Sequence, residues 1–285
     1  MNGVLRWLRT PKGQLLGIFA IMLAIVAPAG GPALLPNLLA VLVPACLIDG
    51  VWMAIEIRRW RAPMSALLCG LIIFFILSTN ESWLVVGWTS GFAILSKRIL
   101  RGDREHFFNP AALALLWAPI AFGSGESWWG AFGDMPRIWI ALLLLLGAFL
   151  TDRLNKFPVV LAFLAAYFGF FTLASLGNAT GVAEMFREPF LQAALFLAFF
   201  MLTDPPTSPN RYADQVWFGV LAAVSAGVAQ LMGAGQVYLL VGVLVSNAAL
   251  AVVRYARRRR SESTVLGVQT SAYPGRYAAR TAERR

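Results

Sequence analysis

The chain has 285 residues, of which 59% are hydrophobic and 13% charged, whereas a soluble globular domain carries about 25% charged residues. With a mean hydropathy of +0.68, this composition excludes an ordinary soluble domain and indicates a protein of the lipid bilayer. The single histidine excludes a histidine-rich metal site, and the sequence predicts no metal.

The net charge of +10 is unevenly distributed along the chain. From Arg254 onward there are nine basic and two acidic residues, a net charge of +7, and the remainder, with 15 basic and 12 acidic residues, carries only +3. The cluster Arg257–Arg260 directly follows an apolar segment, where cytoplasmic basic residues contact anionic lipid. We therefore expect no nucleic-acid-binding surface.

Ten apolar segments, each near the ~20 residues that a bilayer requires, follow one another along the chain. Their approximate cores are 13–29, 33–54, 63–79, 83–96, 108–122, 137–151, 157–174, 189–203, 215–232 and 235–253. The first resembles a signal peptide, but it lacks a small-residue cleavage site, so we expect a retained helix. The sequence thus predicts an all-α polytopic membrane domain over residues 1–255, followed by a basic, disordered tail over 256–285.

The loops between these segments alternate in charge. Basic residues precede the first segment and follow the second, fourth, sixth, eighth and tenth, whereas the other loops contain mainly acidic residues. This positive-inside pattern predicts a multi-pass protein of the inner (plasma) membrane with both termini in the cytoplasm. Tryptophans near the segment ends are expected as interfacial anchors, namely Trp60, Trp83, Trp128, Trp129 and Trp217.

Asn109 and Pro110 begin the fifth segment on the predicted cytoplasmic side. Proline suits the first position of a helix, because the N–H that it lacks has no partner there, and asparagine before it can cap the helix. A good N-cap is sufficient to explain this pair. Asp49, near the end of the second segment, also has two interpretations. An intramembrane carboxylate indicates function, but the nearby Glu56, Arg58 and Arg59 are equally consistent with a place at the interface.

The eighth segment ends abruptly at Thr203-Asp204-Pro205-Pro206. Proline cannot continue a helix, and the short oxygens of Thr203 and Asp204 can bind backbone groups at the break. One interpretation is a polar loop that ends a membrane helix. The other is a rigid site at a helix end, where backbone dipoles face ions or carboxylates. Since this break and Asn109-Pro110 lie on the same side, we predict that the two approach each other.

Two segments resemble signatures of the RnfD/NqrB family, the membrane subunits of ion-motive redox complexes. They are residues 108–112, FNPAA, and residues 198–211, AFFMLTDPPTSPNR. Residues 246–249, SNAA, suit the last helix of that family. The resemblance covers most of residues 60 to 255.

The resemblance implies ten helices in two inverted five-helix halves, within a subunit that takes part in redox-coupled cation translocation or flavin-dependent electron transport. Other subunits of a membrane redox complex are then expected as partners, besides the bilayer. The alternative is a stand-alone transporter or small-molecule-binding relative without electron transfer, and enzymatic activity stays open. Under either, the candidates for a ligand or ion site are Asn109, Pro110, Thr203, Asp204, Pro205, Thr207, Arg211 and Asn247.

The same resemblance implies FMN esterified to a threonine in a Ser/Thr-Gly-Ala-Thr motif. The corresponding segment here, Gly123–Trp129, has no threonine, and the nearest look-alike is Thr180 in Gly177–Gly181. A Gly-Asn-x-x-Gly sequence is also typical of a turn. We therefore expect no covalent FMN, while FMN or riboflavin without a covalent bond remains compatible with the sequence.

Overall fold

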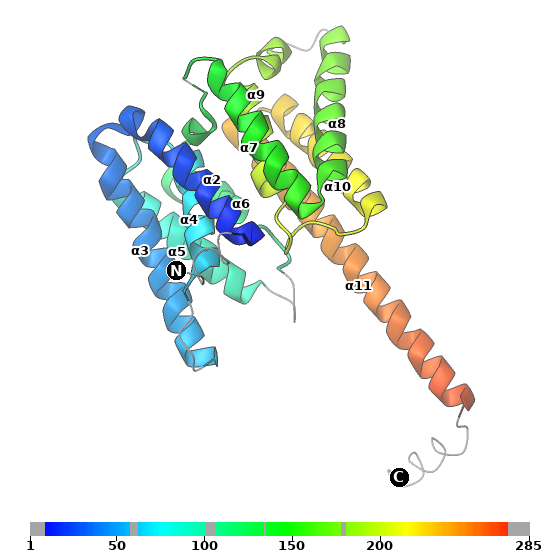
Figure 1. Ribbon diagram of the computed structural model, residues 1–285. Helices are drawn as coiled ribbons and strands as arrows, with labels where there is room; N and C mark the ends of the chain where they lie inside the picture. The colour runs from blue at the N-terminus through cyan, green and yellow to red at the C-terminus, as the bar shows by residue number, and fades with distance from the viewer. Residues whose placement is uncertain (1–8, 58–61, 101–105, 134, 178–180, 273–285) are drawn as a thin grey trace. The chain divides into compact units, whose positions relative to one another are not determined.

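The computed structural model of the protein describes residues 9–57, 62–100, 106–133, 135–177 and 181–272 (Figure 1). Over these residues the regular structure is helical, apart from isolated bridge residues that include the antiparallel pair Leu77 and Glu126. This confirms the predicted all-α class. One compact unit ends at Asn247 and a second begins at Ala248, and the candidate site lies within the first.

Each of the ten predicted apolar segments coincides with a helix. The first five helices are α2 (Pro11–Val26, continued by the 3-10 helix η1, Ala27–Ala33), α3 (Leu34–Ile57), α4 (Met64–Ile76), α5 (Trp83–Ile99) and α6 (Pro110–Phe122). The other five are α7 (Ile138–Leu154), α8 (Phe157–Leu176), α9 (Phe190–Phe196, continued by η4, Leu197–Met201), α10 (Tyr212–Leu231) and α11 (Tyr238–Ala272).

Four helical stretches are long and apolar enough to cross a membrane, namely Gly30–Glu56, Phe157–Leu176, Tyr212–Leu231 and Gly235–Arg259. Four others are apolar but shorter, namely Pro11–Val26, Met64–Ile76, Pro110–Phe122 and Phe190–Met201. The protein is thus a multi-pass membrane protein, while ten crossings and inverted halves remain predictions. Helix α11 extends to Ala272 and so includes residues 256–272, while the division into a membrane domain over 1–255 and a tail over 256–285 stays a prediction.

Helix α4 is the central helix among α2 to α6. It contacts α2, α3, α5 and α6, and every residue from Leu68 to Leu77 is buried. A helix that is apolar on all sides belongs in the interior. At ~1.5 Å per residue, its 13 residues span about 20 Å, so it is shorter than the bilayer core.

The segment that follows α6 closes one end of α4. Trp128 and Phe132 have left-handed backbone conformations, which cost energy for non-glycine residues, and both side chains are buried. The indole N–H of Trp128 donates to the carbonyl of Gln236, and that of Trp129 donates to the carbonyl of Phe74. Trp128 is therefore an internal anchor of this segment, and its prediction as an interfacial residue was wrong.

A cluster of aromatic rings fills the interior between the two ends of α4. The Phe19 ring lies 5.5 Å from Phe75 and 5.3 Å from Phe200, and Phe75 lies 6.1 Å from Trp129. Aromatic pairs at these separations are favourable beyond their buried area. The cluster joins helices α2, α4 and η4 in a layer of apolar side chains.

Candidate functional site: a cavity between two proline-marked helix ends

The Asn109-Pro110 break is built as the sequence suggests. Asn109 is extended and its side-chain Oδ1 accepts a hydrogen bond from the N–H of Ala112 at 3.1 Å, while Pro110 occupies the first turn. The N-cap interpretation is confirmed. The backbone N–H of Asn109 itself donates to Oδ1 of Asn247 at 2.8 Å, a contact that local sequence could not predict.

The second break begins with a π-helical turn. Helix α9 passes into η4, where the N–H of Leu202 donates to the carbonyl of Leu197. Single π-turns occur frequently at functional sites because they release backbone groups and redirect side chains. The Thr203 hydroxyl donates to the carbonyl of Phe199, four residues earlier, and so satisfies one of the groups that the turn releases.

The loop after the π-turn is held rigidly by hydrogen bonds. The Asp204 carboxylate accepts from the Thr207 hydroxyl at 2.9 Å, and its backbone carbonyl accepts from the N–H groups of Thr207 and Ser208. Nζ of Lys156 donates to the carbonyl of Pro209 at 2.5 Å. The break is therefore an ordered structure and more than a connecting loop.

Asn247 of α11 joins the two breaks. Its Oδ1 accepts from the Asn109 N–H, and its Nδ2 donates to the Thr207 carbonyl at 2.9 Å. Only 2% of Asn247 is exposed. Buried backbone N–H and carbonyl groups need hydrogen-bond partners. The single amide of Asn247 supplies one to the N–H at the start of α6 and one to a carbonyl in the loop after η4.

The two breaks line a common cavity of about 390 Å³, which confirms the prediction that they approach each other. The apolar walls include Leu15, Leu68, Ile72, Leu150 and Phe200. The polar lining includes Lys12, Ser65, Lys97, His106, Asn109, Thr203 and Asp204. Cavities of ~300–1,000 Å³ with apolar walls and a few polar groups are typical of small-molecule sites.

Lys97 places a basic group at a fixed position on one wall of the cavity. Its Nζ donates to Ser65 Oγ at 2.8 Å and lies 3.7 Å from the carboxylate of Asp49. Asp49 also accepts from Arg98 at 2.5 Å. A buried carboxylate with two cationic partners is satisfied within the fold, so Asp49 acts on the cavity by holding Lys97.

Asp204 is the acidic group of the cavity. Burial raises the pKa of its carboxyl above the ordinary value. The Thr207 hydroxyl and three lysine charges, from Lys97, Lys12 and Lys156, act in the opposite direction. Asp204 therefore lies in an environment that favours the protonated form more than water does, yet close to positive charge.

Not all predicted residues line this cavity. Asn109, Pro110, Thr203, Asp204 and Pro205 do. Thr207 and Asn247 support it through the hydrogen bonds given above, and Arg211 is exposed at the N-cap of α10 and does not line it. Thr180 lies outside the described residues.

Sequence reasoning missed the two lysines. Lys12 and Lys97 line the cavity, although the sequence placed them only as topology-determining charges. The signal that could have found them is their position at segment ends on the same side as both breaks.

Residues 124–262 match the NQR2, RnfD, RnfE family. The matched region includes the π-turn, the Thr203–Arg211 loop and Asn247, but it begins after Asn109. The comparison with curated proteins found no match.

Proposed function

From the match of residues 124–262 to the NQR2, RnfD, RnfE family, we propose that the chain is a member of this family and a membrane subunit of a redox-linked, cation-translocating assembly. We further propose that the cavity between the two breaks is its ligand site. The observation that carries the proposal is this cavity, whose lining combines apolar walls with two lysines, Lys12 and Lys97, and one aspartate, Asp204. Electron transfer through the subunit requires a bound redox group, because no described side chain in the cavity has a suitable potential.

The donor set of the cavity suits a planar heteroaromatic group such as a flavin. Leu68, Ile72 and Phe200 supply apolar surface for ring faces, while Asn109, Lys97 and Asp204 supply polar groups for ring edges. The volume of about 390 Å³ admits a tricyclic ring system. A bound flavin would supply one- and two-electron redox chemistry.

The residues of the chain would tune such a group through charge. A fixed cation near a ring stabilises added negative charge, and the Lys97 ammonium is held in place by Ser65 and Asp49. Because burial raises the pKa of Asp204, its carboxylate would take up a proton more readily than in water when negative charge enters the cavity. Reduction and cation uptake would in this way be coupled in one site.

The experiment is binding of riboflavin and FMN to the purified, flavin-depleted protein, followed by flavin fluorescence. Asp204→Asn removes the charge in the cavity, and we expect at least a tenfold weaker affinity, about 1.4 kcal/mol. Asp214→Asn is the matched control, because Asp214 is a buried aspartate bonded to Trp217 and does not line the cavity. Equal effects of the two substitutions, or no flavin binding by the unaltered protein, would refute the assignment.

The alternative is a stand-alone carrier of a small molecule that performs no electron transfer. It is favoured by the lack of a threonine in Gly123–Trp129, the segment where the family resemblance places covalent FMN. The two readings separate in reconstituted vesicles. A redox subunit would show a reversible flavin absorbance change on addition of a reductant, and a carrier would move its ligand with no such change.

A further inference from the structure

A second polar cluster lies at the end of α4 opposite the cavity. Residues 123–127 follow the end of α6 and form backbone hydrogen bonds with the last residue of α4 and with the segment after it. The N–H of Ser78 donates to the carbonyl of Gly125, and the N–H of Ser127 donates to the carbonyl of Ile76, both at 2.9 Å. The aromatic layer connects the two ends of α4, because Phe200 lines the cavity and the Phe75 ring lies 6.1 Å from that of Trp129.

Glu126 is buried in this cluster with part of its carboxyl unsatisfied. Only 7% of the residue is exposed, and Oε1 has no hydrogen-bond partner among the described residues. Ser124, also 7% exposed, and Ser127 each have a hydroxyl oxygen with no partner in the same part of the chain. Buried polar groups are nearly always paired, so three unsatisfied oxygens within four residues indicate a missing ligand.

The surroundings of Glu126 supply further oxygen and no positive charge. Glu81 is the charged side chain that acts on it, and Oε1 of Glu81 accepts from the N–H of Gly125 at 2.9 Å. Asn37 donates its amide to the Glu81 carbonyl. Within the described ranges, no lysine or arginine forms an ion pair with Glu126 or Glu81.

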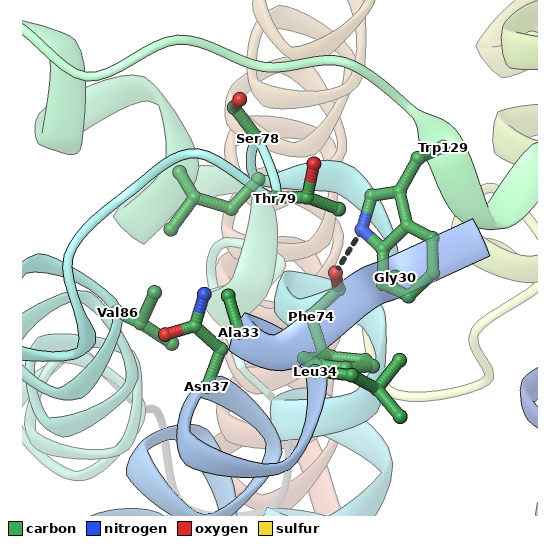
Figure 2. A pocket seen from close by; sticks show the side chains of 10 residues that line it. Gly30, Ala33, Leu34, Asn37, Phe74, Ser78, Thr79, Val86 and Trp129 are labelled. Atoms are coloured by element: carbon green, nitrogen blue, oxygen red, sulfur yellow. Dashed lines mark hydrogen bonds between the residues drawn. The ribbon is translucent and has the colours of Figure 1, made fainter. Parts of the chain in front are cut away.

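A small cavity of about 10 Å³ lies beside this cluster. Figure 2 shows Asn37, Ser78 and Thr79 around it, with the Trp129 indole bonded to the Phe74 carbonyl. Leu77 lines this small cavity and is the bridge partner of Glu126. A volume of this size holds about one water molecule. The end of α4 is therefore tightly built, and the carboxyl of Glu126 is not needed for the bridge, which uses backbone groups alone.

We propose that Glu126, with the hydroxyls of Ser124 and Ser127 and the nearby carboxylate of Glu81, forms a site for a monovalent cation, either a proton or Na⁺. A buried carboxylate without a cationic partner must bind a proton or a metal ion to be stable. Carboxylate and hydroxyl oxygens are ligands that hard cations prefer. The proposal does not depend on what the cavity binds, since it follows from the contacts of this cluster.

The electrostatics agree with this geometry. Burial raises the pKa of Glu126 to about 7, its own backbone N–H acts to lower it, and the charge of Glu81 raises it further. The carboxyl would then exchange a proton near neutral pH. Gly123 and Gly125 beside it are exposed, so the exchange needs no passage through the aromatic layer.

The test is a pH titration of the carboxyl groups by infrared spectroscopy on the purified protein, in choline chloride and in NaCl. We expect a carboxyl that titrates near pH 7 in choline chloride and is lost in Glu126→Gln. Glu184→Gln is the matched control, because Glu184 is exposed, and it should leave this signal unchanged. Carbon-13 labelling of glutamate gives the same titration in the unaltered protein if the variant does not fold.

The two salts separate the two cations. If Na⁺ binds, its competition lowers the apparent pKa by about one unit for each tenfold rise in Na⁺ above the dissociation constant. If only a proton binds, the titration is the same in both salts, and the site is confirmed as a proton site. A Glu126 carboxyl that titrates near the ordinary value of about 4.3 in choline chloride would overturn the proposal.

Discussion

Replacing Asn247 by alanine should loosen both breaks at once. The substitution removes a 2.8 Å bond to the Asn109 N–H and a 2.9 Å bond to the Thr207 carbonyl, and at 2% exposure water cannot readily replace them. Each buried group left unpaired costs about 1–3 kcal/mol, although side-chain hydrogen bonds inside membranes average only about 0.6 kcal/mol. Since neither backbone group has another hydrogen-bond partner among the described residues, we expect a loss of about 3 kcal/mol.

Ser246→Ala is the matched control on the neighbouring residue. Its hydroxyl makes one buried bond, at 3.2 Å, to the Phe218 carbonyl, and this carbonyl lies within α10, so the loss should be below about 1 kcal/mol. Thermal unfolding in detergent measures the stability, and amide hydrogen exchange reports the Asn109 N–H directly. If Asn247→Ala is no more destabilising than Ser246→Ala, and Asn109 exchanges as before, Asn247 does not join the breaks.

Four further predictions concern helix packing, the Glu126 carboxyl, the topology and the flavin. Gly219→Ala should lower the stability of the protein by about 2 kcal/mol or more, because the added Cβ would lie 2.5 Å from the carbonyl oxygen of Val159 in α8. Gly169→Ala, which has open space around it, should leave the stability unchanged in the same thermal assay. Burial raises the pKa of Glu126 from 4.5 to about 7, so the folded state holds this proton more tightly than the unfolded state. The resulting contribution to stability, of order 3 kcal/mol, should be fully present below pH 4.5 and lost as the pH rises through about 7. Unfolding midpoints that do not change over this pH range would contradict the prediction. Cysteines at Ser175 and Asn210, both exposed and near opposite ends of α8, should label from opposite sides of the membrane, Asn210 from the cytoplasm. The band on a denaturing gel should show no flavin fluorescence, and a fluorescent band would mean covalent attachment.

The helices could be predicted from the sequence because apolar segments of bilayer length have few alternatives. Each predicted segment became a helix, and the N-cap at Asn109 followed from local chemistry. Helix ends were less predictable. Helix α11 runs to Ala272, since the hydropathy that ends a membrane span does not end a helix.

The candidate site was only partly predictable for a different reason. Proline and short polar residues mark the two breaks in the sequence, and the predicted topology places both breaks on the same side of the membrane. The contacts of Lys97 with Ser65 and Asp49 join residues far apart in the chain, which no local pattern encodes. Glu126 likewise becomes notable only once the fold buries it beside Glu81.

The most direct test of the ligand site is an electron cryomicroscopy map of the purified protein with riboflavin or FMN added. The account predicts density for a planar ring system in the cavity, between Asn109 of one break and Asp204 of the other, within reach of Lys97. Ring density at any other place, with the cavity between the breaks filled by side chains or lipid, would contradict it.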